Sequence, residues 1–174
     1  MRDPRGRPRV LSMNAQSARL ERARIRLRAV ASLDEMVSAL SATGREIAGS
    51  DGIAVVLRSG GFCHYVAEDA IMPLWRGSRF RLEECISGWA MLNGRAAVVP
   101  DVWNDLRVPV AVYKASSVRS LVMTPIGTPI PVAALGAYWC DSIEPDSGTV
   151  QRLQALADMS TEALTRLQPS TCAA

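Results

Sequence analysis

The hydrophobic residues of this chain change their spacing twice along the sequence. In residues 15–31 they recur at steps of three and four, as on one face of a helix. Between residues 52 and 140 they form short runs bounded by glycine and proline, which is typical of buried strands. The helical spacing returns after Pro145, a residue that suits the first turn of a helix. This order predicts an α+β fold, with an antiparallel sheet between helices, and not the βαβ alternation of a nucleotide-binding parallel sheet.

The boundaries of the elements follow from local signals. Ser32, with Glu35 three residues later, predicts the start of a second helix, and Gly49 predicts its end. Glycines at 60 and 61 predict a hairpin between two strands. The remaining expected elements are an irregular segment at 70–83, a short helix at 86–94, a short strand at 96–99, a helical turn or two at 110–117, strands at 120–127 and 131–140, and a long helix at 146–168.

Two of the expected helices carry an apolar seam with the spacing of a coiled coil. The seams consist of Leu20, Ala23, Leu27 and Val30 in the first helix, and of Val150, Leu153, Ala157, Ser160, Leu164 and Leu167 in the last. Because a single small domain has little room to cover both, we expect the chain to form a homodimer through helices 15–31 and 146–168.

Charge and composition separate a basic leading segment from a mildly acidic domain. Residues 1–28 hold nine arginines against two acids, a net charge of +7, and the rest of the chain has a net charge of −4. Residues 1–14 are predicted to be a disordered arm and residues 169–174 a tail. Solvated helix faces explain the arginines better than nucleic-acid binding does. No apolar run is long enough for a membrane span and no secretory signal is present, so we expect a cytoplasmic protein.

Four sequence blocks in the expected sheet region resemble the GAF domain signature, in the family's order and spacing. They are CISGWAML, VVPDVWNDLRVP, VRSLVMTPI and PVAALGAYW. The resemblance is strongest to the GAF domains of bacterial sensor histidine kinases of the HWE type, and it covers roughly residues 33–168. It implies an antiparallel sheet with helices on one face and a ligand pocket on the other, preceded by a linker helix at 15–31. It further implies a sensory module in signal transduction, with a histidine kinase or another output domain as a partner.

The loop that follows the short strand at 96–99 has two alternative interpretations. Asp101 and Asp105 are placed to accept backbone N–H bonds and to fix turns, and Arg107 is close enough to pair with either carboxylate. In one interpretation this loop clamps the rim of the pocket, and in the other Arg107 faces a bound ligand. Catalysis by the two aspartates is the weakest interpretation, because the chain supplies no activated nucleophile or metal beside them.

Aromatic residues in irregular segments are the other candidates for ligand contact, because binding residues concentrate in such segments. We expect segments 71–83 and 101–119 to roof the pocket. The predicted pocket residues are Trp75, Phe80, Asp101, Trp103, Asp105, Arg107, Tyr113 and Arg119. The sequence does not identify the ligand or any cofactor.

The cysteines and the single histidine argue against most enzymatic chemistry. Cys63 and His64 are neighbours in a strand and point to opposite faces, so they cannot form a catalytic pair. No metal-binding spacing is present. The helical turn at 110–117 lacks the cysteine to which phytochrome-related GAF domains attach a bilin, which argues against covalent bilin binding. No Asn-Lys pair is present, which weakens a cyclic nucleotide as ligand.

Two alternatives to a ligand sensor remain open. One is a non-catalytic dimerisation module whose pocket is filled by its own side chains. The other is an enzyme similar to the free methionine sulfoxide reductases, which also have this fold. Cys85 lies near a cysteine of that family, but the partner cysteine expected after the Asp101 loop is missing. We therefore expect that Cys85 has no resolving thiol and that the protein is not an enzyme.

Overall fold

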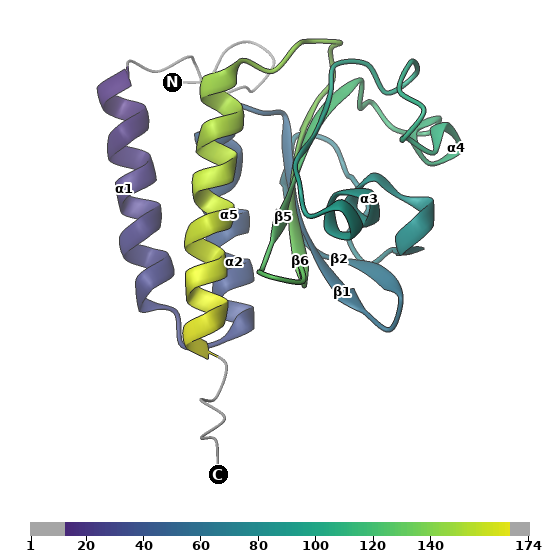
Figure 1. Ribbon diagram of the computed structural model, residues 1–174. Coiled ribbons are helices and arrows are strands. Elements are labelled where there is room, and N and C mark those ends of the chain that lie inside the picture. Colours follow the sequence, from purple (N-terminus) through teal and green to yellow (C-terminus); the bar gives the residue numbers. More distant parts are fainter. Residues whose placement is uncertain (1–12, 168–174) are drawn as a thin grey trace.

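The computed structural model describes residues 13–167, which form one antiparallel sheet with helices on both faces (Figure 1). The six strands are ordered β3-β2-β1-β6-β5-β4. The helices are α1 (Met13–Ala29), α2 (Leu33–Ala48), α3 (Ile86–Asn93), α4 (Val110–Tyr113) and α5 (Ser147–Leu167). The strands are β1 (Gly52–Ser59), β2 (Phe62–Ala70), β3 (Arg79–Arg81), β4 (Ala97–Val99), β5 (Ser120–Ile126) and β6 (Ala133–Trp139), and a 3-10 turn, η1 (Leu82–Glu84), precedes α3. The predicted α+β class is confirmed.

Local sequence signals set the ends of α2 and the first hairpin as predicted. The Ser32 hydroxyl accepts a hydrogen bond from the Glu35 backbone N–H at 3.2 Å, and the Glu35 carboxylate accepts one from the Ala31 N–H at 2.8 Å. Gly49 ends the helix in the left-handed conformation, with φ of 67°. These bonds satisfy backbone groups that a helix end leaves without partners, which explains why this boundary was readable from sequence.

Two predicted boundaries differ from the structure. The segment 70–83 was expected to be irregular throughout, but it contains the three-residue strand β3, which pairs with the start of β2, and part of η1. A strand this short leaves no periodic pattern to detect. The first helix begins at Met13, two residues earlier than expected. The rest of the predicted arm (1–12) and the predicted tail (169–174) lie outside the described residues.

Most residues of the two helical seams are buried within the chain and the others are partly buried, so the argument that a second copy must cover them is wrong. Helices α2 and α5 pack directly on one face of the sheet, and α1 packs on the outside of these two helices (Figure 1). On α1, Ala23 and Leu27 are at most 2% exposed, and on α5 Leu153 is fully buried. The short link between α1 and α2 makes them antiparallel neighbours, and α5 packs on both. The Arg166 guanidinium on α5 also donates to the carbonyl of Leu27 at 3.0 Å.

The sheet separates two hydrophobic clusters, and β6 contributes to both. Leu135 and Trp139 point toward α2 and α5, whereas Ala134 and Tyr138 point toward α3 and α4. Every residue of β6 is buried, which explains its continuous apolar sequence. None of the helices in residues 13–167 is long and apolar enough to cross a membrane.

Candidate functional site

Five aromatic rings gather on the face of the sheet that carries α3 and α4. Tyr65 of β2 packs against Trp75 with 5.8 Å between ring centroids and against Phe80 of β3 at 5.6 Å. Trp75 in turn contacts Tyr113 of α4 at 4.9 Å and Tyr138 of β6 at 5.5 Å. All four contacts are edge-to-face, the arrangement that ring quadrupoles favour. We refer to these five residues as the aromatic cluster.

The predicted pocket residues Trp75, Phe80 and Tyr113 all belong to the aromatic cluster, and sequence reasoning missed Tyr65 and Tyr138. A signal for Tyr138 was present. A Cβ atom on Gly136 would lie 2.5 Å from the Tyr138 hydroxyl and 2.7 Å from the Met123 methyl group. Gly136 and Tyr138 share one face of β6, so a glycine two residues before a strand tyrosine indicates that the ring lies over the glycine.

Burial keeps the tyrosines of the cluster neutral. It raises the pKa of Tyr138 and Tyr113 well above the usual range, and it raises that of Tyr65, to which nearby Cys85 also contributes. The Tyr65 and Ser87 hydroxyls form a buried hydrogen bond of 2.7 Å. The cluster therefore presents apolar rings with a few neutral hydroxyl groups, which suits an aromatic or apolar partner.

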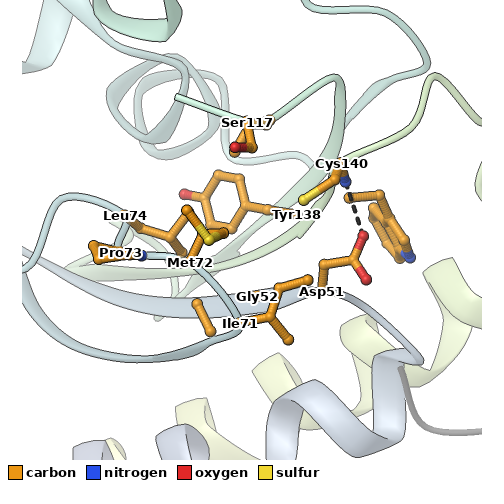
Figure 2. A pocket seen from close by; sticks show the side chains of 12 residues that line it. Asp51, Gly52, Ile71, Met72, Pro73, Leu74, Ser117, Tyr138 and Cys140 are labelled. Atoms are coloured by element: carbon orange, nitrogen blue, oxygen red, sulfur yellow. Dashed lines mark hydrogen bonds between the residues drawn. The ribbon is translucent and has the colours of Figure 1, made fainter. Parts of the chain in front are cut away.

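A small cleft adjoins the cluster at Tyr138 (Figure 2). Its lining comes from the start of β1, the segment after β2, the segment before β5 and the end of β6. The lining residues are Asp51, Gly52, Ala70, Ile71, Met72, Pro73, Leu74, Ser117, Val118, Tyr138, Trp139 and Cys140. Both segments predicted to roof a pocket, 71–83 and 101–119, contribute residues to this cleft. Water-sized molecules have only about 10 Å³ of room in it, roughly enough for one water.

Hydrogen bonds join two of the segments that line the cleft. Figure 2 shows the Asp51 carboxylate accepting the backbone N–H of Cys140, at 2.8 Å. The Asp51 backbone N–H donates to the carbonyl of Tyr138 at 2.9 Å. The start of β1 is therefore fixed to the end of β6, and the segment 71–74 on the opposite side carries the exposed Met72. The cleft has one rigid wall and one wall in a loop.

The loop after β4 is a clamp in which its own charged groups bond one another. The Asp101 carboxylate accepts the Trp103 N–H at 2.9 Å and the Asn104 side-chain amide at 2.7 Å. The Asp105 carboxylate accepts the backbone N–H and the guanidinium of Arg107, whose Nη2 also donates to the Val98 carbonyl at 2.8 Å. These bonds match the first interpretation of the loop, and a ligand contact by Arg107 stays a prediction.

The Asp105–Arg107 pair shifts both pKa values in the direction that favours the charged forms. The hydrogen bond from Arg107 is the main cause of the lowered pKa of Asp105, and the same bond raises the pKa of Arg107. Both side chains remain partly exposed, at 15% for Asp105 and 30% for Arg107. The pair therefore fixes the loop without being sealed from solvent.

The last two predicted pocket residues lie next to each other. The Arg119 guanidinium lies over the Trp103 ring, 5.4 Å from its centroid, and Trp103 is 40% exposed. Trp89 of α3 has a similar contact with Arg107, at 4.8 Å. These cation–π contacts tie the loop to its surroundings, outside the aromatic cluster.

Cys85 has a thiol partner, so the expectation that no resolving thiol is near it is wrong. The partner is Cys63 of β2, which is buried in the same hydrophobic cluster and lies close enough to Cys85 for each thiol to shift the pKa of the other. This interaction raises the pKa of Cys63, which burial raises further, and it lowers the pKa of Cys85 against the opposing effect of burial. No local pattern indicates the pair, because 21 residues lie between its members and only the folded chain brings them into one cluster.

The Cys85 thiol also caps the start of α3, where it accepts the N–H of Gly88 at 3.4 Å. Cys63 and His64 follow the alternation of side chains along β2. Cys63 is fully buried in the cluster on the α3 side, and His64 is only half-buried. Among residues 13–167, no three His, Cys, Asp or Glu side chains are grouped so that they could hold a metal ion.

Comparison with known proteins supports the fold through structure rather than sequence. No family model and no curated protein sequence matches the chain. The GAF domain of an Acinetobacter phosphoenolpyruvate-protein phosphotransferase superposes with a TM-score of 0.74 at 12% identity, covering 89% of this chain and 96% of that one. A phycocyanobilin-bound GAF domain from a cyanobacterial phytochrome gives 0.72 at 18% identity, covering 90% and 97%.

An enzyme structure is also similar to this chain. The free methionine-R-sulfoxide reductase of Neisseria meningitidis, solved with its substrate, gives a TM-score of 0.76 at 18% identity, covering 90% of this chain and 93% of that one. At these identities the similarity establishes the fold alone. Similar chains thus include GAF domains and an enzyme. The chain has the GAF fold.

Proposed function

We propose that this protein is a non-catalytic GAF sensory module that binds a small, largely apolar ligand at the aromatic cluster and the adjoining cleft. The observation that carries the proposal is the position of Trp75. It contacts Tyr65, Tyr113 and Tyr138, which come from three different elements, yet it sits on a loop that also borders the cleft. A displacement of this loop would join the cleft to the ring surfaces and make room for a ligand.

The relay in this proposal runs through β6 to the helical layer. Tyr138 belongs to the aromatic cluster, and the next residue, Trp139, points to the opposite face of the sheet. The Trp139 indole N–H donates to the carbonyl of Gly49, at the end of α2, at 3.1 Å. A ligand that shifts Tyr138 would therefore shift the end of α2, on which α1 and α5 pack. The ligand can change the helices only by the difference in its affinity for the two arrangements.

The output in this proposal is a homodimer formed through the outer faces of α1 and α5, coupled in a cytoplasmic two-component system to a histidine kinase or another signalling domain. Ile25 on α1 supports the choice of this face, because it is 62% exposed although the seam beside it is buried. Sedimentation equilibrium is expected to give a dimer at micromolar concentration. Ile25→Glu is expected to weaken the dimer at least tenfold, which is about 1.4 kcal/mol. A chain that remains monomeric would remove this output from the proposal.

The ligand is tested by native mass spectrometry of the full chain purified from its own host, compared with the denatured mass. We expect extra mass that is released on denaturation. Ser117 stands over the Tyr138 ring in Figure 2, so Ser117→Trp fills the cleft and is expected to abolish the extra mass. Thr128→Trp, at an exposed position in the β5–β6 turn, is the control and should retain it. Identical native and denatured masses for the natural chain would contradict ligand binding.

The second candidate function is a dimerisation or interaction module with a pocket filled by its own side chains. The specific observation in its favour is the room of about 10 Å³ in the cleft, against the several hundred cubic ångströms of an ordinary ligand site. In this case the aromatic cluster is simply the core of that side of the sheet. Native mass spectrometry separates the two functions, because a filled module forms the dimer but carries no extra mass in any variant.

A further inference from the structure

The Cys63–Cys85 pair is chemistry that neither proposed function uses. Both cysteines are free thiols in the hydrophobic cluster on the α3 side of the sheet, and each shifts the pKa of the other. Buried cysteines are often inert packing groups, so burial alone would assign them nothing. Two features distinguish these thiols from simple packing groups. They occupy matching positions in two segments that a hydrogen bond joins, and the surroundings of the two sulfur atoms differ.

Cys63 and Cys85 occupy matching positions in β2 and at the start of α3. Cys63 and Tyr65 lie two residues apart on one face of β2. Cys85 and Ser87 lie two residues apart at the start of α3. The Tyr65 hydroxyl is hydrogen-bonded to that of Ser87 at 2.7 Å, and each cysteine lies two residues before its member of this bonded pair. This hydrogen bond holds the two segments at a fixed separation, and the thiols are therefore kept opposite each other.

The surroundings of the two sulfur atoms favour different roles. Cys85 is at the N-terminal end of α3 and accepts a hydrogen bond from the Gly88 N–H at 3.4 Å, and both features stabilise a thiolate. Cys63 is fully buried, and burial favours its protonated form. Cys85 is also the member with some exposure, at 6%. A small reagent would meet Cys85 first.

We propose that Cys63 and Cys85 form a redox dithiol that a hydroperoxide oxidises to an intramolecular disulfide. The Cys85 thiolate attacks one peroxide oxygen and the O–O bond breaks, leaving a sulfenic acid on Cys85, while the departing oxygen takes a proton and leaves as water or an alcohol. The Cys63 sulfur then attacks the Cys85 sulfur, its own proton joins the leaving hydroxyl group, and water departs. The two thiols lose two electrons in total, and the hydroperoxide gains them.

Oxidation at this site acts on the aromatic cluster through Tyr65. Forming the S–S bond draws the sulfur atoms to about 2.05 Å, closer than two free thiols lie. The start of α3 is then tied covalently to β2, two residues from Tyr65, and the Tyr65–Ser87 bond must adjust. The site is independent of the ligand proposal, because the oxidation is measured with no ligand added, and either proposal can fail while the other holds.

The test uses the full chain with Cys140→Ser and Cys172→Ser, so that Cys63 and Cys85 are the only thiols. The protein is treated with hydrogen peroxide, unfolded, and labelled with N-ethylmaleimide for intact-mass measurement. We expect a mass lower by about 2 Da with no label, and two labels again after dithiothreitol. Peptide mapping of the unsubstituted chain should find Cys63 linked to Cys85. Two labels after peroxide treatment, or stepwise oxygen addition without the mass loss, would overturn the proposal.

Two single variants test the assigned roles in the same background. Cys63→Ser should leave a sulfenic acid on Cys85 that dimedone traps, and Cys85→Ser should slow the loss of the remaining thiol by at least about tenfold. Equal rates in the two variants would overturn the assignment of Cys85 as the attacking thiol. Circular dichroism checks that each variant folds. If Cys63→Ser does not fold, the peptide map of the unsubstituted chain decides the proposal by itself.

Discussion

Gly88→Ala tests the close packing of α3 against η1. A Cβ atom added at Gly88 would lie 1.8 Å from the carbonyl oxygen of Leu82 in η1, whereas ordinary contact begins at 3.4 Å. The obstacle is backbone, so no side-chain rotation can relieve it. The start of α3 would have to move away from η1 by roughly 1.5 Å, which also disturbs the Cys85 cap.

The expected magnitude is the balance of two effects. Overpacking against a rigid neighbour costs about 1–3 kcal/mol, and more where backbone must move. Alanine in place of a helical glycine gains up to about 1 kcal/mol in return. Because the obstacle is backbone, we expect the upper part of this range, so that Gly88→Ala lowers the free energy of unfolding by about 1–3 kcal/mol, out of the 5–15 kcal/mol of an ordinary domain. The expected fall in Tm is on the order of 10 °C.

The assay is urea unfolding followed by circular dichroism, with Gly148→Ala as the matched control. Gly148 is also helical, but a Cβ there meets only the ends of the Asp146 and Arg152 side chains, at 3.0 and 3.2 Å. Its free energy of unfolding should change by less than about 1 kcal/mol. The midpoint for Gly88→Ala should fall with little change in slope. Equal stability of Gly88→Ala and the natural chain would refute the close approach of α3 to η1.

Three further predictions concern the loop clamp, the aromatic cluster and catalysis. Because the folded-state pKa of Asp105 is lowered, its contribution is present above its unfolded pKa near 3.8 and is lost as pH falls through the folded value. Asp105→Asn should therefore lower the free energy of unfolding, measured by urea unfolding, by about 0.5–1 kcal/mol at pH 7. The difference from the natural chain should vanish at the acidic end of the titration. A difference that stays constant with pH would contradict this prediction. Trp75→Ala should cost about 2–4 kcal/mol and open a cavity that binds indole, seen as a Tm increase with added indole that the natural chain lacks. Free methionine-R-sulfoxide with dithiothreitol should give no turnover above that of Cys85→Ser, because the cleft has no room for an amino acid; Cys85-dependent turnover would favour the reductase alternative.

The order of the elements and many of their ends could be predicted from local patterns. Hydrophobic spacing distinguished helices from strands, and local caps such as Ser32 and Gly49 fixed boundaries, because these signals depend only on residues a few positions apart. The Asp101 and Asp105 turns were readable for the same reason. The three-residue strand β3 was not, since its only stabilising partner is β2.

Which surfaces meet could not be predicted in this way and became clear only from the folded chain. The seams of α1 and α5 looked like dimer interfaces, yet they cover each other and α2, because spacing along a helix shows that a face is apolar but not what covers it. The same limit applied to Tyr65 and Tyr138 in the aromatic cluster, and to the Cys63–Cys85 pair. Contacts between residues far apart in the chain depend on strand register and sheet order, and these are set by the packing of the whole domain rather than by any local pattern.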